Sequence, residues 1–156
     1  MRQVSPHALW IGNSGDVRNL DAVRSVGILA IVDLAMAERP LFISREDVYC
    51  RFPLLDGPGN PPWLLRSAAE CVASFLRSAT PVLVFCGAGM SRSPTIAAAG
   101  LSLHTGDDLD RCLALVLADG PRDVSPSLLL SVERALKSSG SEPPELSWEL
   151  PPEGTA

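Results

Sequence analysis

A short segment just past the middle of the chain combines residues that bind anions with one that can act as a nucleophile. Its sequence is Cys86-Gly87-Ala88-Gly89-Met90-Ser91-Arg92. The apolar run 81–85 before it predicts a buried strand, and a helix is predicted to start at about Ser93. Because a helix N-terminus presents unpaired N–H groups and partial positive charge, this strand–loop–helix pattern predicts an anion site.

The residue types in this loop suit attack on a bound phosphate group. Gly87 and Gly89 let the backbone turn so that successive N–H groups point inward, and Arg92 can donate two hydrogen bonds to one phosphate. The same positive potential favours the thiolate form of Cys86, which is the nucleophilic form. Ser93 can donate a hydrogen bond to that sulfur when it becomes a leaving group. We expect the phosphate to be held by Gly87, Ala88, Gly89, Met90, Ser91 and Arg92.

The leaving oxygen of a phosphate ester must be protonated, and the acid has to come from another loop. Asp56 stands in a sharp turn, Asp56-Gly57, at the end of the predicted strand 48–55. Loops that follow parallel strands at one edge of a sheet converge on one site, so Asp56 is the first candidate for the acid. Asp123 is the second candidate. A role for Asp56 as a plain turn residue stays open, since Asp-Gly is a common turn pair.

Apolar strand-like runs and amphipathic helical segments alternate along the chain. Strands are predicted over 8–11, 28–34, 48–55 and 81–85, and helices from Ser14 or Asp16 to about Val26, over 63–76, 93–103 and 109–118, and from Ser125 to about Ser138. The Gly, Pro, Asp and Ser residues between them are typical of caps and turns. This alternation predicts an α/β fold with a central, mostly parallel sheet of four to five strands flanked by helices.

A change in composition divides the chain after residue 138. Residues 1–138 are expected to form a single folded domain, because their number suits one hydrophobic core. Residues 139–156 are rich in Pro, Glu and Ser, and we expect them to form a flexible tail.

The composition narrows the class of partner. A net charge of −5 argues against binding to nucleic acid or to an anionic membrane, both of which need a basic face. No apolar run is long enough to span a bilayer. The four cysteines show no C-x-x-C spacing and the two histidines have no ligand-like neighbours, so neither a metal nor a cofactor is expected.

The cysteines also bear on the compartment. The start of the chain lacks the pattern of a secretion signal, which favours a reducing, cytoplasmic location with free thiols. One alternative stays open, a protective disulfide between Cys50 and Cys86, if the strands that hold these residues are neighbours.

The loop and its flanks resemble a known family. The loop, together with Ser93, is similar to the Cys-x-x-Gly-x-x-Arg-Ser/Thr signature of the protein tyrosine phosphatase superfamily, and its surroundings resemble the dual-specificity branch. The similar segments are Leu9-Trp10-Ile11-Gly12-Asn13, 27–34, Arg51-Phe52-Pro53-Leu54-Leu55-Asp56 and Ser125-Pro126-Ser127. The resemblance covers residues 9–136. It implies the fold of that superfamily and hydrolysis of phosphotyrosine, with phosphoserine and phosphothreonine as further substrates, through a phosphocysteine intermediate and without a metal.

Phe85 departs from the family pattern, because relatives usually have His before the cysteine. That His orients the loop and tunes the thiolate by hydrogen bonding, whereas Phe85 can pack but cannot donate a hydrogen bond. We therefore expect lower activity than in relatives with His, and a catalytically weak phosphate-binding module is an alternative function. A sulfurtransferase or an arsenate reductase is a further alternative, since both chemistries use a cysteine in an anion-binding loop.

The loop positions Ala88, Met90 and Ser91 are uncharged, whereas lipid phosphatases resembling this family tend to have lysines there. The expected partner is therefore a phosphorylated protein or a small phosphomonoester. The sequence makes no prediction of the oligomeric state.

Overall fold

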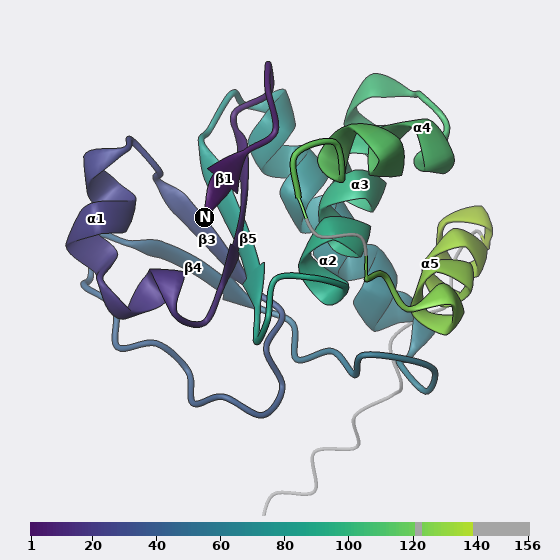
Figure 1. The fold of residues 1–156 in the computed structure, drawn as a ribbon, viewed down its shortest axis with the longest axis horizontal. Helices are drawn as coiled ribbons and strands as arrows, with labels where there is room; N and C mark the ends of the chain where they lie inside the picture. The colour runs from purple at the N-terminus through teal and green to yellow at the C-terminus, as the bar shows by residue number, and fades with distance from the viewer. Residues whose placement is uncertain (121–122, 139–156) are drawn as a thin grey trace, which may run out of the picture.

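The computed structural model describes residues 1–120 and 123–138, and these form a central sheet with helices on both faces (Figure 1). The strands are β1 (Arg2–Gln3), β2 (Leu9–Asn13), β3 (Ala30–Asp33), β4 (Val48–Arg51) and β5 (Val82–Cys86). Their order in the sheet is β1-β2-β5-β3-β4. β1 pairs antiparallel with β2, and the other neighbours are parallel, which confirms the predicted α/β fold.

The helices lie in two unequal layers. On one side are the 3-10 helix η1 (Asp16–Arg18) and α1 (Leu20–Ser25), and on the other are α2 (Pro62–Arg77), α3 (Arg92–Thr105), α4 (Leu109–Val116) and α5 (Pro126–Lys137) (Figure 1). Side chains of the central strand β5 alternate between the two faces of the sheet. Val82, Val84 and Cys86 belong to the larger core under α2 and α3, whereas Leu83 and Phe85 belong to the smaller core. This alternation follows from the two-residue period of a strand.

Close packing between α2 and α3 fixes the direction in which α3 leaves the loop 86–92, which is called the phosphate loop below. Small residues on α3 allow the two backbones to approach, and a Cβ added to Gly100 would lie 2.6 Å from the Val72 Cβ. Pro94 sits in the first turn of α3, where its missing N–H is not needed. The C-terminus of α3 is closed by Gly106, which has a φ of 80°.

Two predicted elements differ from the structure. The helix expected from Ser14 or Asp16 is divided into η1 and α1, and Asn19 caps α1 by accepting the Ala22 N–H at 3.1 Å. Asp16 is not available as a helix cap because its carboxylate accepts the Asn13 N–H at 2.9 Å.

The strand expected over 48–55 ends at Arg51, because only 48–51 pair with β3. β1 was not expected, since two residues carry no periodicity. The expectation of a flexible tail concerns 139–156, which lie outside the described residues. Within 1–120 and 123–138, none of the helices is both long enough and apolar enough for a membrane span.

Candidate active site

Four loops meet at one edge of the sheet, where β2, β3, β4 and β5 all end (lower edge in Figure 1). The register pairs Asn13 with Cys86, and Asp33 with both Phe85 and Arg51. Because these strands are parallel, the loops that follow them start side by side. The predicted nucleophile and the predicted acid are therefore on loops that leave the same edge of the sheet, although they are 30 residues apart in the sequence.

Cys86 is the last residue of β5 and is 2% exposed. Its Sγ accepts the backbone N–H of Gly89 at 3.2 Å. The sulfur thus lies inside the loop, directed at one of the N–H groups that are expected to bind the anion. The role of Cys86 as the nucleophile stays a prediction.

The end of β2 supports the outer side of this loop. Ser14 donates both its N–H and its hydroxyl to the Gly87 carbonyl, at 3.1 Å and 3.0 Å. These two bonds hold the Gly87 carbonyl against the end of β2. Gly89 has a φ of 74°, and a Cβ there would lie 2.7 Å from the Gly12 carbonyl oxygen. Glycine is required at this position for both its backbone conformation and the space it leaves.

Arg92 begins α3, and its guanidinium turns back toward the loop. Nη1 donates to the Leu54 carbonyl at 3.2 Å, and Nη2 lies 3.3 Å from the point that a Cβ on Gly87 would occupy. Nε is buried, and no described residue offers it a hydrogen-bond partner. A buried donor without a partner costs free energy, and an acceptor placed at this nitrogen would satisfy it.

Asp56 lies on the loop after β4, and its exposed carboxylate is tied to the phosphate loop. Ser91 donates its hydroxyl to Asp56 Oδ1 at 2.6 Å. The structure therefore brings the predicted acid next to the predicted phosphate site. The second candidate, Asp123, is exposed, and no described residue joins its carboxylate to the loop.

Asn60 organises the acid loop and was not singled out in the sequence. Its side chain accepts the Leu55 N–H at 2.8 Å and donates to the carbonyls of Leu55 at 3.0 Å and Gly57 at 3.1 Å. Asn60 is only 9% exposed. These three bonds close the turn around Asp56. The only signal in the sequence was an Asn among glycines and prolines, which also suits any ordinary turn.

Ser93 is fully buried, and its hydroxyl donates to the Gly12 carbonyl at 3.5 Å, a long hydrogen bond. It is next to Arg92 in the first turn of α3. Its predicted bond to the sulfur is not formed in this state, so the role of Ser93 remains a prediction.

Glu38 is a second residue that the sequence analysis missed. It lies on the loop after β3, and a Cβ added to Gly87 would be 2.5 Å from its Oε1. Its other oxygen, Oε2, is buried and has no hydrogen-bond partner among the described residues. Arg51 donates to the Glu38 carbonyl at 3.0 Å and so fixes the backbone of this loop. A negative charge therefore lies against the anion site.

The loop that holds Glu38 contacts a polar cluster on β3 and β4, since the Leu41 N–H donates to the Tyr49 hydroxyl at 3.4 Å. Tyr49 donates to the buried carboxylate of Asp33 at 2.5 Å. Burial and this bond raise the pKa of Tyr49 to about 12. Arg51 also pairs with Asp33, at 3.3 Å.

The proposed disulfide between Cys50 and Cys86 is incompatible with the strand order. Cys50 is on β4 and pairs with Val32 of β3, which in turn pairs with Val84 of β5. Two strand spacings amount to about 9–10 Å, which exceeds the roughly 7 Å limit between Cα atoms for a disulfide. All four cysteines are free. Cys50 instead lies beside Cys71, and burial together with this neighbour raises the pKa of Cys71 to about 12.

Phe85 packs in the smaller core on the opposite face from Cys86 and is 2% exposed. It offers no side-chain hydrogen bond to the loop, as expected. Within the described residues, no group of three His, Cys, Asp or Glu side chains is arranged to hold a metal ion.

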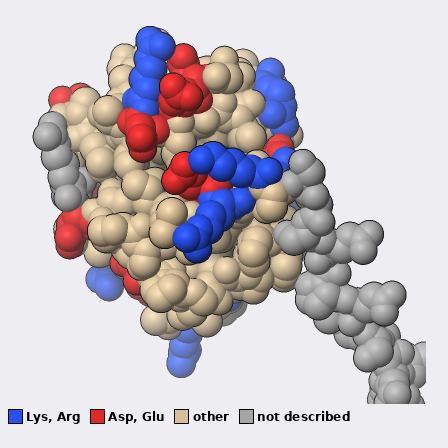
Figure 2. Space-filling view, turned by 90° about the vertical axis from the view of Figure 1, so that its right-hand side faces the viewer, with Lys and Arg blue, Asp and Glu red and all other residues tan. Residues whose placement is uncertain are grey.

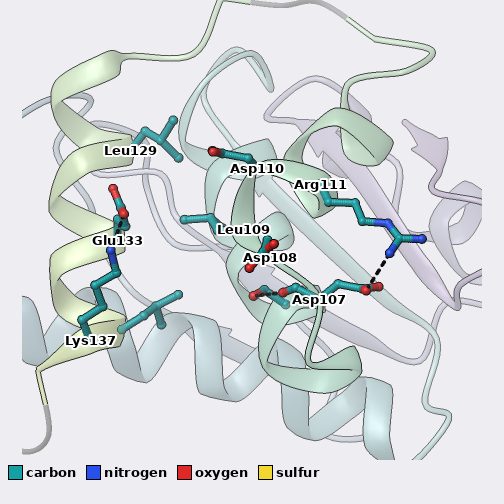
Figure 3. Close-up of a pocket in the computed structure, with 10 residues that line it drawn as sticks. Asp107, Asp108, Leu109, Asp110, Arg111, Leu129, Glu133 and Lys137 are labelled. Carbon is teal, nitrogen blue, oxygen red and sulfur yellow. Dashed lines mark hydrogen bonds and ion pairs between the residues drawn. The ribbon is translucent and has the colours of Figure 1, made fainter.

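A cavity of about 590 Å³ lies away from this edge, between α4 and α5. Leu109 and Asp110 from α4 and Leu129 from α5 point into it (Figure 3). Charged residues on its rim pair locally. On this side of the molecule, basic and acidic side chains are interspersed and form no extended patch of one sign (Figure 2).

No protein-family model matches the chain. A curated relative, the mouse dual specificity protein phosphatase 8, is 32% identical over 145 residues that cover 88% of this chain. The chain belongs to the dual-specificity phosphatase family. It spans 21% of the length of that relative.

Solved structures of the dual-specificity phosphatase family share the fold. Human DUSP28 superimposes with a TM-score of 0.72 at 19% identity, and the match covers 86% of this chain and 94% of that one. DUSP15 gives a TM-score of 0.68 at 26% identity, with 86% and 85% covered. The family resemblance inferred from the loop and its flanks is thereby confirmed.

Proposed function

We propose that this chain is a dual-specificity phosphatase that hydrolyses phosphate monoesters through a phosphocysteine intermediate. The observation that supports this most strongly is the pairing of two groups in one loop. The Cys86 sulfur accepts a loop N–H at 3.2 Å, and the Arg92 Nε is buried and lacks a partner among the described residues. Such an arrangement suits a nucleophile and an anion that are held together.

The proposed reaction has two steps. In the first, the Cys86 thiolate attacks phosphorus, the S–P bond forms and the bond to the leaving oxygen breaks, while Asp56 gives that oxygen its proton. In the second, the Asp56 carboxylate takes a proton from water as the water attacks phosphorus, and the S–P bond breaks to return the thiolate. Ser93 would leave its bond to Gly12 and donate to the departing sulfur. Arg92 and the loop N–H groups hold the phosphate in both steps.

The proposed substrates are phosphorylated proteins or small phosphomonoesters, with phosphotyrosine first and phosphoserine and phosphothreonine as further substrates. Ala88, Met90 and Asp56 are exposed at the loop, which suits a shallow site open to protruding side chains of different length. The four free thiols support a reducing, cytoplasmic location.

The test is hydrolysis of an aryl phosphate by the wild-type chain beside Cys86→Ser. We expect turnover by the wild type and loss of turnover by at least about 10⁴-fold in the variant, as for other removed nucleophiles. Equal turnover by both proteins would rule the proposal out.

The alternative functions correspond to other results of the same set of assays. A wild-type chain that binds a phosphopeptide but does not hydrolyse it would be a phosphate-binding module. The replacement of the usual His by Phe85 would then explain the lack of hydrolysis. Turnover of thiosulfate or arsenate without aryl phosphate hydrolysis would indicate a sulfurtransferase or an arsenate reductase.

A further inference from the structure

We propose that Ser91 is a positioning residue for the acid Asp56. Its hydroxyl bonds to one carboxylate oxygen of Asp56, so that the other oxygen, Oδ2, carries the transferred proton. The inference rests on the proposed hydrolysis and adds a side-chain role to Ser91, whose backbone is expected to bind the phosphate. Ser91 is 5% exposed, and its two hydroxyl bonds reach loops that are far away in the sequence.

The direction of both Ser91 hydroxyl bonds follows from which groups can donate a proton. The backbone N–H of Ser125 lies 3.0 Å from Ser91 Oγ, and an N–H can only donate. The Ser91 oxygen is therefore the acceptor in that bond, and its single proton is free to point elsewhere. It is directed at Asp56 Oδ1, at 2.6 Å.

This direction determines which carboxyl oxygen can act as the acid. An oxygen that accepts the Ser91 proton is poorly placed to hold a proton of its own on the same side. When Asp56 is protonated, its proton is therefore on Oδ2, and Oδ2 delivers it to the leaving oxygen. After the first step, Oδ2 has a free lone pair with which to take the proton from the attacking water.

The location of Ser91 explains why this bond matters for catalysis. Asp56 is exposed on a loop, where a short side chain samples several rotamers unless a partner holds it. Ser91 lies between Met90 and Arg92, within the loop that is expected to surround the phosphate. The bond therefore fixes the acid relative to the anion itself, and correct placement is a large part of the effect of a catalytic group.

Ser91 is not needed for the ordinary capping role of its position. It is the N-cap residue of α3, yet its side chain makes no capping bond to that helix. Its carbonyl performs the local structural role, since it accepts both the N–H and the hydroxyl of Thr95, at 3.1 Å and 2.7 Å. The hydroxyl is left for the two long-range bonds.

The test compares Ser91→Ala with Ser91→Thr, which keeps the hydroxyl, on aryl phosphates with different leaving groups. Phenol leaves poorly and needs the acid, whereas dinitrophenol leaves readily without it. We expect Ser91→Ala to lower kcat/KM for phenyl phosphate by about tenfold, the effect of one lost hydrogen bond, and to change dinitrophenyl phosphate less than about twofold. Ser91→Thr should recover most of the activity toward phenyl phosphate.

The same variants in an Asp56→Asn background separate positioning from general loop damage. With no acid to position, Ser91→Ala should cause no further loss for phenyl phosphate. Equal losses for both leaving groups, or an undiminished loss in the Asp56→Asn background, would overturn the positioning role.

A measurement that is independent of turnover keeps this inference distinct from the proposed function. NMR couplings report the χ1 angle of Asp56 in the unliganded protein. We expect a single rotamer in the wild type and in Ser91→Thr, and averaged rotamers in Ser91→Ala. Averaging that is the same in all three proteins would overturn the inference even if the chain is an active phosphatase, whereas a wild-type chain without hydrolysis would overturn the proposed function alone.

Discussion

The phosphate-loop edge and the α4/α5 cavity differ in the range of the bonds that hold their polar side chains. In the cavity, Asp107 pairs with Arg111 and Glu133 pairs with Lys137, each four residues apart. At the edge, the bonds from Ser91 to Asp56 and Ser125, and from Ser14 to Gly87, join residues that are 35, 34 and 73 positions apart.

The difference shows why the phosphate-loop edge is a better candidate for a site than the cavity. A helix alone brings residues four positions apart together, and such exposed pairs stabilise it only slightly. Bonds across loops form only when the whole sheet is assembled, so they hold side chains in a geometry that the fold has prepared. The Lys137 ammonium holds the pKa of Glu133 below its usual range, but this pair is exposed and forms part of the ordinary surface.

The largest expected difference between the regions concerns their arginines. We predict that Arg92→Ala lowers kcat/KM for an aryl phosphate by about 10³-fold, because it removes donors aimed at the charge that develops on the phosphate. Arg111→Ala removes the arginine on the cavity rim and is the matched control. It should leave kcat/KM unchanged. Similar losses in both variants would show that the cavity takes part in the reaction.

A carboxylate at the phosphate-loop edge should likewise affect activity more than a carboxylate on the cavity rim. Asp56→Asn is expected to lower kcat by about 10²-fold for phenyl phosphate, since the leaving oxygen is no longer protonated. Asp108→Asn, on the cavity rim, should leave kcat unchanged. If Asp123→Asn produced the larger loss, the acid would be the second candidate.

Two glycines with similar positive φ angles compare backbone strain alone with strain plus a close contact. Gly89 and Gly106 have φ of 74° and 80°. At Gly106 a Cβ meets open space, so we expect Gly106→Ala to cost about 1 kcal/mol in the free energy of unfolding, from strain alone, and to leave activity intact.

At Gly89 a Cβ would also press on the Gly12 carbonyl. Gly89→Ala should therefore cost about 1–3 kcal/mol more and lower activity by about tenfold or more, as the loop shifts. Urea unfolding and aryl phosphate kinetics measure the two effects. Equal costs and equal activity would mean that the loop adapts freely.

Glu38 should give the smallest effect. Its carboxylate lies against Gly87 and opposes a bound anion, so Glu38→Gln is predicted to tighten binding of inorganic phosphate by about threefold, a modest change because the site is partly solvated. Glu46→Gln, an exposed residue on the same loop, is the control. Weaker binding in Glu38→Gln would instead mean that Glu38 helps to hold the loop in shape.

The sequence predicted the parts of the site whose signals are local. A few neighbouring residues are enough to predict a strand, a turn or a helix start. Examples are the run 82–86, the glycines of the loop and the Ser-Pro at the start of α5. The acid was predicted because parallel strands end at one edge, which is a rule about the fold and not about contacts.

The remaining residues could not be predicted because their roles depend on contacts between distant segments. Asn60 acts through a turn that many sequences could form, Glu38 through a loop of irregular backbone, and the Ser91 hydroxyl through partners on two other loops. The interrupted helix near Asp16 has the same cause, since Asp16 bonds back to the end of β2 rather than capping a helix.

The central claim is that the Cys86 sulfur becomes covalently attached to the phosphoryl group, and trapping the intermediate tests this most directly. The wild-type chain is mixed with an aryl phosphate, quenched in acid within a turnover and digested for mass spectrometry. The account predicts a phosphoryl group on the peptide that contains Cys86, absent in Cys86→Ser. Steady hydrolysis with a phosphoryl group on another residue, or with none on Cys86 at any quench time, would contradict it.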